Sequence, residues 1–286
     1  MAVIQSYKKK GRNIMGENIT LIRKFKKYRN LSVLGYVVSL ILLCLGWYAV
    51  IWELGYYEDS ERLFRYSMIA FYFILAVLSV FFLYASTVIK AQISKILLNE
   101  SDPEKFFQVY FSVFRANKKS VLTWQASIAY LTGNFDGCLQ YCEKIEKLNK
   151  PKLLYYPATN RARTAAMTGD KEMLAAETEK MVRYSAFLKR KREKEDAAKI
   201  AEQFHMLSDL LNGNTEEAKM RADSLKAASE CPMSEALCAY YRGLVYKQSG
   251  ETVKAIHCFM TASEKGGKMF VKEKSDENLK ELTEQP

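Results

Sequence analysis

Six cysteines and two histidines are the residues of this 286-residue chain that could bind a metal or act as nucleophiles. Cys138 and Cys142 stand four residues apart, a spacing that places both on one face of a helix. A second group lies closer to the C-terminus and comprises Cys231, Cys238, His257 and Cys258. No pair has the C-x-x-C spacing of structural zinc sites. We therefore expect apolar packing of Cys138 and Cys142, no metal and no cofactor.

Catalysis by a histidine would involve His205 or His257, and each lies in a stretch with helical periodicity. The sequence contains no nucleophile elbow, no phosphate-binding loop and no H-E-x-x-H motif around them. Packed or exposed helix histidines explain both positions, so we predict that the protein is not an enzyme. A membrane-attached enzyme without a recognisable motif is an alternative.

Basic residues form two dense runs. The first comprises Arg23, Lys24, Lys26, Lys27 and Arg29. It either marks the cytoplasmic side of a membrane or binds anionic lipid headgroups, at about 1 kcal/mol per basic residue. The second run, 189–194, has no interleaved aromatic residues of the kind that stack on nucleic-acid bases, so we expect a solvated helix face and no nucleic acid. A lipid- or nucleic-acid-binding module that uses these runs is a further alternative.

Two long uncharged segments, 31–52 and 66–89, could each cross a membrane. A helix needs about 20 apolar residues to span the hydrocarbon core, because every backbone polar group must be paired within the helix. A buried helix of a soluble protein rarely runs so long without a polar face. We predict two transmembrane helices.

The distribution of charge predicts the orientation of this helix pair. Residues 1–30 contain nine basic residues and one acidic residue, whereas the segment 53–65 contains four acidic and two basic residues. Basic flanks stay in the cytoplasm, so we expect a basic cytoplasmic segment at 1–30, a short external loop at 53–65, and a cytoplasmic C-terminal part. A bacterial plasma membrane is the expected location, with the lipid bilayer as one partner.

Beyond residue 90, the sequence predicts helical hairpins. Ser101, Asp102 and Pro103 favour a helix start within a connecting helical region, 90–118. Glycines at 133, 169, 213 and 250 then recur at intervals of 36, 44 and 37 residues, with apolar helix-length stretches on both sides. Each glycine can end one helix in the left-handed conformation, and the polar residue after it can cap the next.

The last of these units carries small and aromatic residues at positions that resemble the tetratricopeptide repeat family. They are Gly243, Tyr246, Gly250, Ala255, Phe259 and Ala262. The other units keep fewer of the positions, and the 44-residue interval between Gly169 and Gly213 holds about ten extra residues around 189–194. The resemblance covers residues 119–267 and implies a right-handed solenoid whose concave groove binds a protein or peptide.

In the family, the first helix of each repeat lines that groove. The resemblance therefore implies a row of groove residues, one small set from each unit: Thr123, Ser127, Tyr130, Tyr156, Thr159, Arg163, Gln203, Tyr240 and Lys247. Their tyrosines and amides suit a peptide or helix held by stacking and hydrogen bonds.

Together these features predict an all-α protein with a two-helix transmembrane hairpin and a solenoid of about four hairpins at 119–286. The expected function is that of a membrane-anchored protein-interaction module: an adaptor, an assembly factor or a regulatory subunit. Its groove is expected at the cytoplasmic face.

Overall fold

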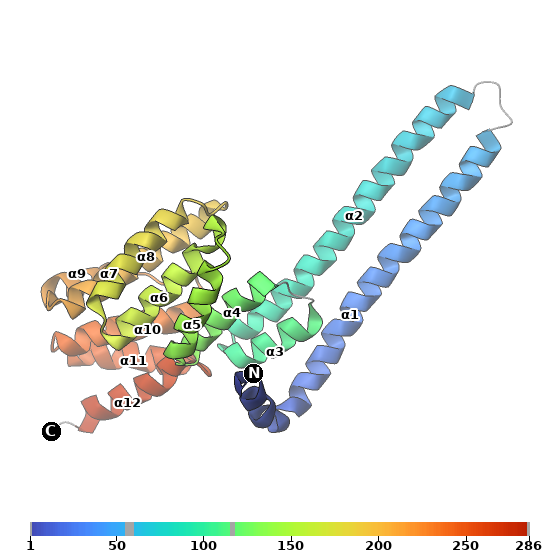
Figure 1. The fold of residues 1–286 in the computed structure, drawn as a ribbon. Coiled ribbons are helices and arrows are strands. Elements are labelled where there is room, and N and C mark those ends of the chain that lie inside the picture. The colour runs from blue at the N-terminus through green and yellow to red at the C-terminus, as the bar shows by residue number, and fades with distance from the viewer. Residues whose placement is uncertain (1, 55–59, 115–117, 285–286) are drawn as a thin grey trace. The chain divides into compact units, whose positions relative to one another are not determined.

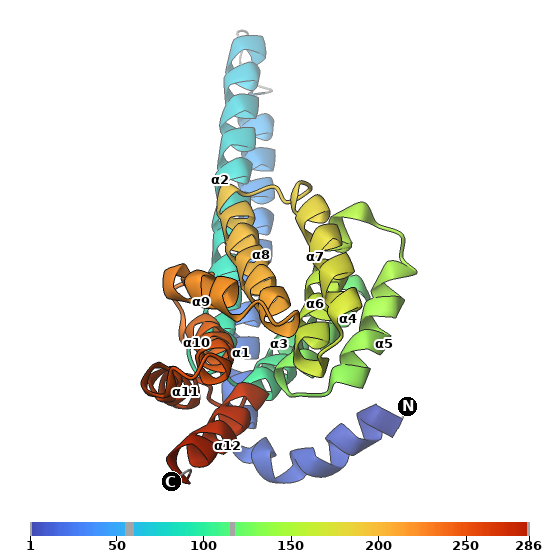
Figure 2. The same ribbon diagram turned by 90° about the vertical axis from the view of Figure 1, so that its left-hand side faces the viewer.

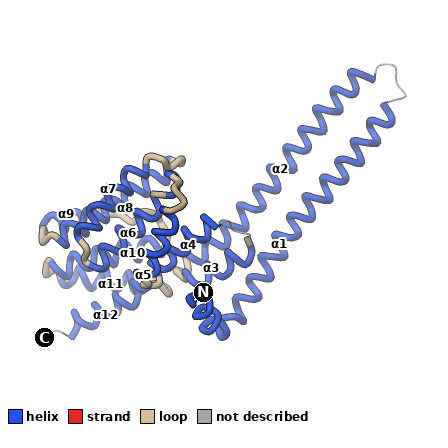
Figure 3. Tube along the Cα trace, viewed as in Figure 1, coloured by secondary structure: helices blue, strands red, loops and turns tan. Residues whose placement is uncertain are grey.

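A computed structural model gives the fold and describes residues 2–54, 60–114 and 118–284. These residues form α-helices and one short 3-10 helix, with no strand among them (Figure 3). The chain divides into two units, Met1–Ser94 and Lys95–Pro286. The expected all-α fold is confirmed.

The first unit is a pair of long helices, α1 (Ala2–Leu54) and α2 (Ser60–Leu98), drawn in blue and cyan in Figure 1. Both are long and apolar enough to cross a membrane, over Asn18–Glu53 and Phe64–Leu98. Aromatic contacts join them: the ring centroids of Tyr36 and Phe82 are 4.9 Å apart, and those of Trp47 and Phe71 are 5.1 Å apart. The Tyr36 hydroxyl also hydrogen-bonds with the Ser79 hydroxyl at 3.2 Å.

The helices extend past both ends of the uncharged segments. Helix α1 includes most of the basic segment 1–30, and α2 begins at Ser60, inside the expected loop 53–65. Glu53 and residues 60–65 thus lie within the helices, and the external location of the segment 53–65 stays a prediction. Residues 55–59 lie outside the described part of the chain.

The second unit begins in the last turn of α2, and its first complete helix is α3 (Pro103–Val113). Its start confirms the prediction from sequence: the Asp102 carboxylate accepts a hydrogen bond from the Lys105 backbone N–H at 3.0 Å, and Pro103 occupies the first turn. The first turn of a helix has backbone N–H groups without a partner in the helix. Asp102 accepts a hydrogen bond from one of them, and Pro103 has no N–H that needs a partner. The buried Phe106 ring packs on Trp124 at 4.7 Å, which joins α3 to the first hairpin.

Four hairpins follow, and the two helices of each pack against one another (Figures 1 and 2). They are α4 (Lys118–Leu131) with α5 (Phe135–Glu146), α6 (Tyr155–Thr168) with α7 (Lys171–Ser185), α8 (Lys191–Leu211) with α9 (Thr215–Ser224), and α10 (Pro232–Gln248) with α11 (Thr252–Lys265). A 3-10 turn, η1 (Pro151–Leu153), precedes α6. Each first helix also packs on the first helix of the next hairpin, a solenoid-like arrangement.

Each hairpin turns at one of the four glycines that recur along the sequence. Gly133, Gly169, Gly213 and Gly250 have φ between +74° and +82°. This left-handed region costs other L-residues about 1–2 kcal/mol, which explains why glycine recurs at the turns. The extra residues of the 44-residue interval between Gly169 and Gly213 lengthen α8 to 21 residues.

The last hairpin has the close approach that its small residues predict. A Cβ added at Gly243 would lie 2.7 Å from Cε1 of Phe259, so only glycine lets the ring of α11 lie against α10. Ala255, Phe259 and Ala262 are fully buried.

The chain ends in α12 (Phe270–Glu284), which packs on α11 and α10. The segment before it also contacts the start of the unit. The Ser101 hydroxyl donates to the Lys265 carbonyl at 2.8 Å, and the Lys268 ammonium pairs with Asp102 at 2.8 Å. The array of hairpins is therefore joined at its two ends, which the repeat pattern alone did not predict.

Candidate functional site

The expected groove residues lie on the first helices of the hairpins, as the repeat pattern indicates, but several are buried. Tyr130 of α4 is fully buried, and its hydroxyl hydrogen-bonds with that of Tyr241 of α10, which is also buried. The Tyr130 ring packs edge-on against Phe270 at 5.4 Å. First and last hairpins thus meet at a pair of phenols where we expected an open groove, and that expectation is wrong for Tyr130.

Arg163 of α6 is half-buried beside this pair. Its guanidinium carbon lies 5.7 Å from the centroid of the Tyr130 ring, within cation–π range. Burial raises the pKa of Tyr130 and of Tyr241, and the charge of Arg163 partly offsets this in both. Both phenols therefore remain neutral at physiological pH and act as structural hydrogen-bonding groups.

The fourth hairpin's expected groove residues are covered by α12. Tyr240 is buried between Phe259 and Phe270, with ring centroids 6.0 Å away in each case. The Lys247 ammonium donates to the Asn278 amide oxygen at 2.8 Å and pairs with Glu281. Tyr240 cannot contact a partner unless α12 moves, so its expected exposure is wrong, whereas the Lys247 side chain keeps 30% of its surface exposed beside α12.

The remaining groove candidates are divided between the interior and the surface. Thr159 and Gln203 are buried, and Thr159 donates to the Tyr155 carbonyl at 2.8 Å. Thr123 donates to the Lys119 carbonyl at 3.0 Å, and Ser127 accepts from the Asn160 amide at 3.3 Å. Tyr156 is the one exposed member, at 40% of its surface.

Tyr156 belongs to an exposed surface that we call the α6–α7 end surface. It also contains Val182 and Phe187, which are 47% and 51% exposed, and the exposed basic residues 189–192, which lie before and at the start of α8. Because α6 and α7 are antiparallel, the start of α6 and the end of α7 lie at the same end of their hairpin. Burial and then the nearby Glu193 carboxylate raise the pKa of Tyr156, which places the start of α8 beside it.

Sequence reasoning missed Val182 and Phe187. Phe187 follows the last turn of α7 and lies between Ala186 and Leu188, so a short apolar segment directly before the basic run was the available signal. The basic residues of the run 189–194 are exposed, as expected for a solvated helix face.

Five of the six thiols are buried and that of Cys44 on α1 is exposed. Cys138 and Cys142 are fully buried, as expected. The hydrogen bond with Cys138 and burial raise the pKa of the Cys142 thiol, and burial raises that of Cys238 to about 11. A thiol that stays protonated near neutral pH is a poor nucleophile. Within the described ranges, no group of three or more His, Cys, Asp or Glu residues could hold a metal ion.

The basic run lies on α1. Arg23, Lys24, Lys26 and Lys27 are exposed, and Arg29 donates to the Asn30 side chain at 2.9 Å. The run directly precedes the apolar part of the helix, so its charges are available near the end of a candidate membrane span.

No protein-family model, curated protein or solved structure matches this chain.

Proposed function

We propose that this protein is a membrane-anchored protein-interaction module: an adaptor, an assembly factor or a regulatory subunit. Its helical hairpins bind another protein at the inner face of the membrane. The observation that carries this proposal is the α6–α7 end surface, where exposed aromatic and aliphatic side chains adjoin four basic residues. Aromatic and arginine side chains are enriched at the centres of protein interfaces.

The anchor in this proposal is the α1–α2 pair, oriented in–out–in. Its support is the length and apolar composition of both helices, together with the excess of basic residues before the first span and the acidic excess at 53–65. With both ends of the pair inside, the hairpins of the second unit lie in the cytoplasm.

The hairpins are proposed to be repeats of the tetratricopeptide type. Four turns with left-handed glycines and the approach of Phe259 to Gly243 support this assignment. The first helices of the hairpins contribute to stability here, because Tyr130 and Tyr241 hydrogen-bond with one another and Phe270 of α12 packs on Tyr240. Partner binding is therefore assigned to the α6–α7 end surface.

The proposed partner is a protein segment that offers an apolar side chain beside acidic residues. The apolar side chain would pack on Phe187 and Val182, and the acidic residues would pair with 189–192. Arg190 and Lys191 have only long intrahelical ion pairs, each 3.8 Å, to Glu193 and Glu195. Such exposed pairs contribute about 1 kcal/mol or less, so a partner's carboxylates can replace them.

Site-specific photo-crosslinking in cells tests this function. A photoreactive phenylalanine analogue replaces Phe187 in one variant and Val253 in a matched control. Val253 lies on α11 and is 83% exposed, so both positions are accessible. We expect one protein to crosslink in stoichiometric amount at position 187 and not at 253. Phe187→Ala with Lys189 and Arg190 changed to Gln should abolish its co-purification with the full chain.

Three results would contradict the proposal. Crosslinking of lipid alone at position 187 would assign the surface to the membrane. Crosslinking of the same proteins at 187 and 253 would show unspecific contact. Recovery of the partner with the Phe187→Ala, Lys189→Gln, Arg190→Gln variant would place its binding surface elsewhere.

A further inference from the structure

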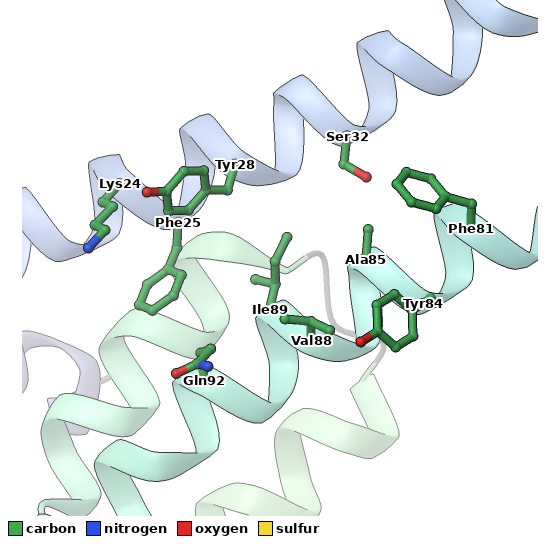
Figure 4. Close-up of a pocket in the computed structure, with 10 residues that line it drawn as sticks. All are labelled: Lys24, Phe25, Tyr28, Ser32, Phe81, Tyr84, Ala85, Val88, Ile89 and Gln92. Carbon is green, nitrogen blue, oxygen red and sulfur yellow. The ribbon is translucent and has the colours of Figure 1, made fainter. Parts of the chain in front are cut away.

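A cavity of about 490 Å³ lies between α1 and α2 inside the first unit (Figure 4). Its volume is within the range of pockets that bind small molecules, roughly 300–1,000 Å³. Side chains from both helices line it, and most are aromatic or aliphatic, including Phe25, Phe81, Ala85 and Val88. The cavity does not use any residue of the hairpins.

The cavity changes character along its length. Lys24 and Gln92 lie at one end, and Ser32 and Phe81 lie at the other (Figure 4). On α1 the eight helical steps from Lys24 to Ser32 correspond to roughly 12 Å of helix, at about 1.5 Å per residue. The polar end coincides with the basic run, and the apolar end lies where the uncharged segment of α1 has begun. One end thus suits an anionic group and the other suits hydrocarbon.

Two exposed tyrosines line the cavity at different points along the helices, Tyr28 on α1 and Tyr84 on α2 (Figure 4). Tyr28 and Tyr84 are exposed at 49% and 67%, and their amphipathic rings favour a membrane–water interface. Phe81 is also largely exposed. The cavity is therefore open at the side of the helix pair that would face lipid, given the proposed membrane insertion.

We propose that this cavity binds one anionic phospholipid. An acyl chain lies against Phe81, Ala85 and Val88, and the phosphate lies at the polar end, where the Lys24 ammonium pairs with it and Gln92 donates a hydrogen bond. The positive charge of Lys24, with that of the adjacent Arg23, favours an anionic headgroup over a zwitterionic one. This inference depends on membrane insertion of the helix pair and is independent of any partner of the hairpins.

Native mass spectrometry of the detergent-solubilised full chain tests the site. Phosphatidylglycerol and phosphatidylcholine with identical acyl chains are the probes. Lys24→Gln should weaken the binding of phosphatidylglycerol about fivefold and leave the binding of phosphatidylcholine unchanged. The control Lys27→Gln removes a charge outside the cavity and should change the affinity for each lipid by less than about twofold. Ala85→Trp should fill the cavity and weaken both lipids about tenfold or more, whereas Ala76→Trp on an exposed face should not.

Inorganic phosphate separates a lipid site from a simple anion site. We expect no displacement of phosphatidylglycerol by phosphate at the same concentration. Equal effects of Lys24→Gln and Lys27→Gln, undiminished binding in Ala85→Trp, or displacement by phosphate would each overturn the proposal. A failure here leaves the crosslinking result at Phe187 unaffected, so the two proposals are tested separately.

Discussion

The hydroxyls of Tyr130 and Tyr241 are hydrogen-bonded although the two residues are 111 positions apart. Tyr130 belongs to the first hairpin and Tyr241 to the last, and both are fully buried. A solenoid in which each repeat contacts only its neighbours would keep these residues apart. This pair, together with Phe270 of α12, joins the ends of the array.

The tyrosine pair should contribute to stability as a unit. Tyr130→Phe removes the partner of the Tyr241 hydroxyl, and a buried polar group left unpaired costs about 1–3 kcal/mol. Tyr241→Phe should cost a similar amount, and the double variant should cost clearly less than the sum of the two. The free energies of unfolding are measured by heating the full chain in detergent. Labelling of the buried cysteines as they become accessible reports unfolding, in a Cys44→Ser background that removes the exposed thiol. Additive losses would show that the hydroxyls do not interact.

Alkaline pH should destabilise the second unit. Burial raises the pKa of Tyr130 and Tyr241 above the ordinary value of 10.0 and raises that of Tyr240 to about 12. Between pH 10 and these higher values, the folded protein holds protons that the unfolded chain has lost. The free energy of unfolding should therefore be unaffected by these groups below pH 10 and fall as pH rises above it. Tyr130→Phe combined with Tyr241→Phe should show a smaller fall, and an equal fall would contradict this assignment.

Local sequence features predicted the helices well, because the physical causes are themselves local. Gly169 and Gly213 adopt the left-handed conformation that their spacing suggested, and Asp102 caps α3 through its own side chain. The groove was predicted less well, because the burial of Tyr130 and Tyr240 depends on α12, which lies far along the chain. The sequence of α12 contains no repeat position, so nothing in the pattern indicated that Phe270 would cover them.

Gly243 should not tolerate a larger side chain. Gly243→Leu places atoms where Phe259 lies and should cost about 1–3 kcal/mol or more, despite the better helix propensity of leucine. Gly243→Ala should cost less and should be partly rescued by Phe259→Leu, which shortens the opposing side chain. The unfolding midpoint of the full chain in detergent measures each variant. An unchanged midpoint for Gly243→Leu would show that α10 and α11 do not pack at this point.

Phe270 should be the residue through which α12 stabilises the unit. Phe270→Ala removes ring contacts with Tyr130, Phe135 and Tyr240 and should cost about 3–5 kcal/mol. Phe187→Ala is the matched control, because Phe187 is half exposed and its loss should change the unfolding free energy by about 0.5 kcal/mol or less. Equal losses in the two variants would contradict the role assigned to α12.

The central claim is that the helix pair crosses a membrane with the hairpins inside, and cysteine labelling in intact cells tests it most directly. Single cysteines replace Ser60, at the start of α2, and Thr283, an exposed residue of α12, in a Cys44→Ser background. A membrane-impermeant thiol reagent should label position 60 in intact cells and position 283 only after lysis. Labelling of position 283 in intact cells, or recovery of the unlabelled chain in the soluble fraction, would contradict the claim.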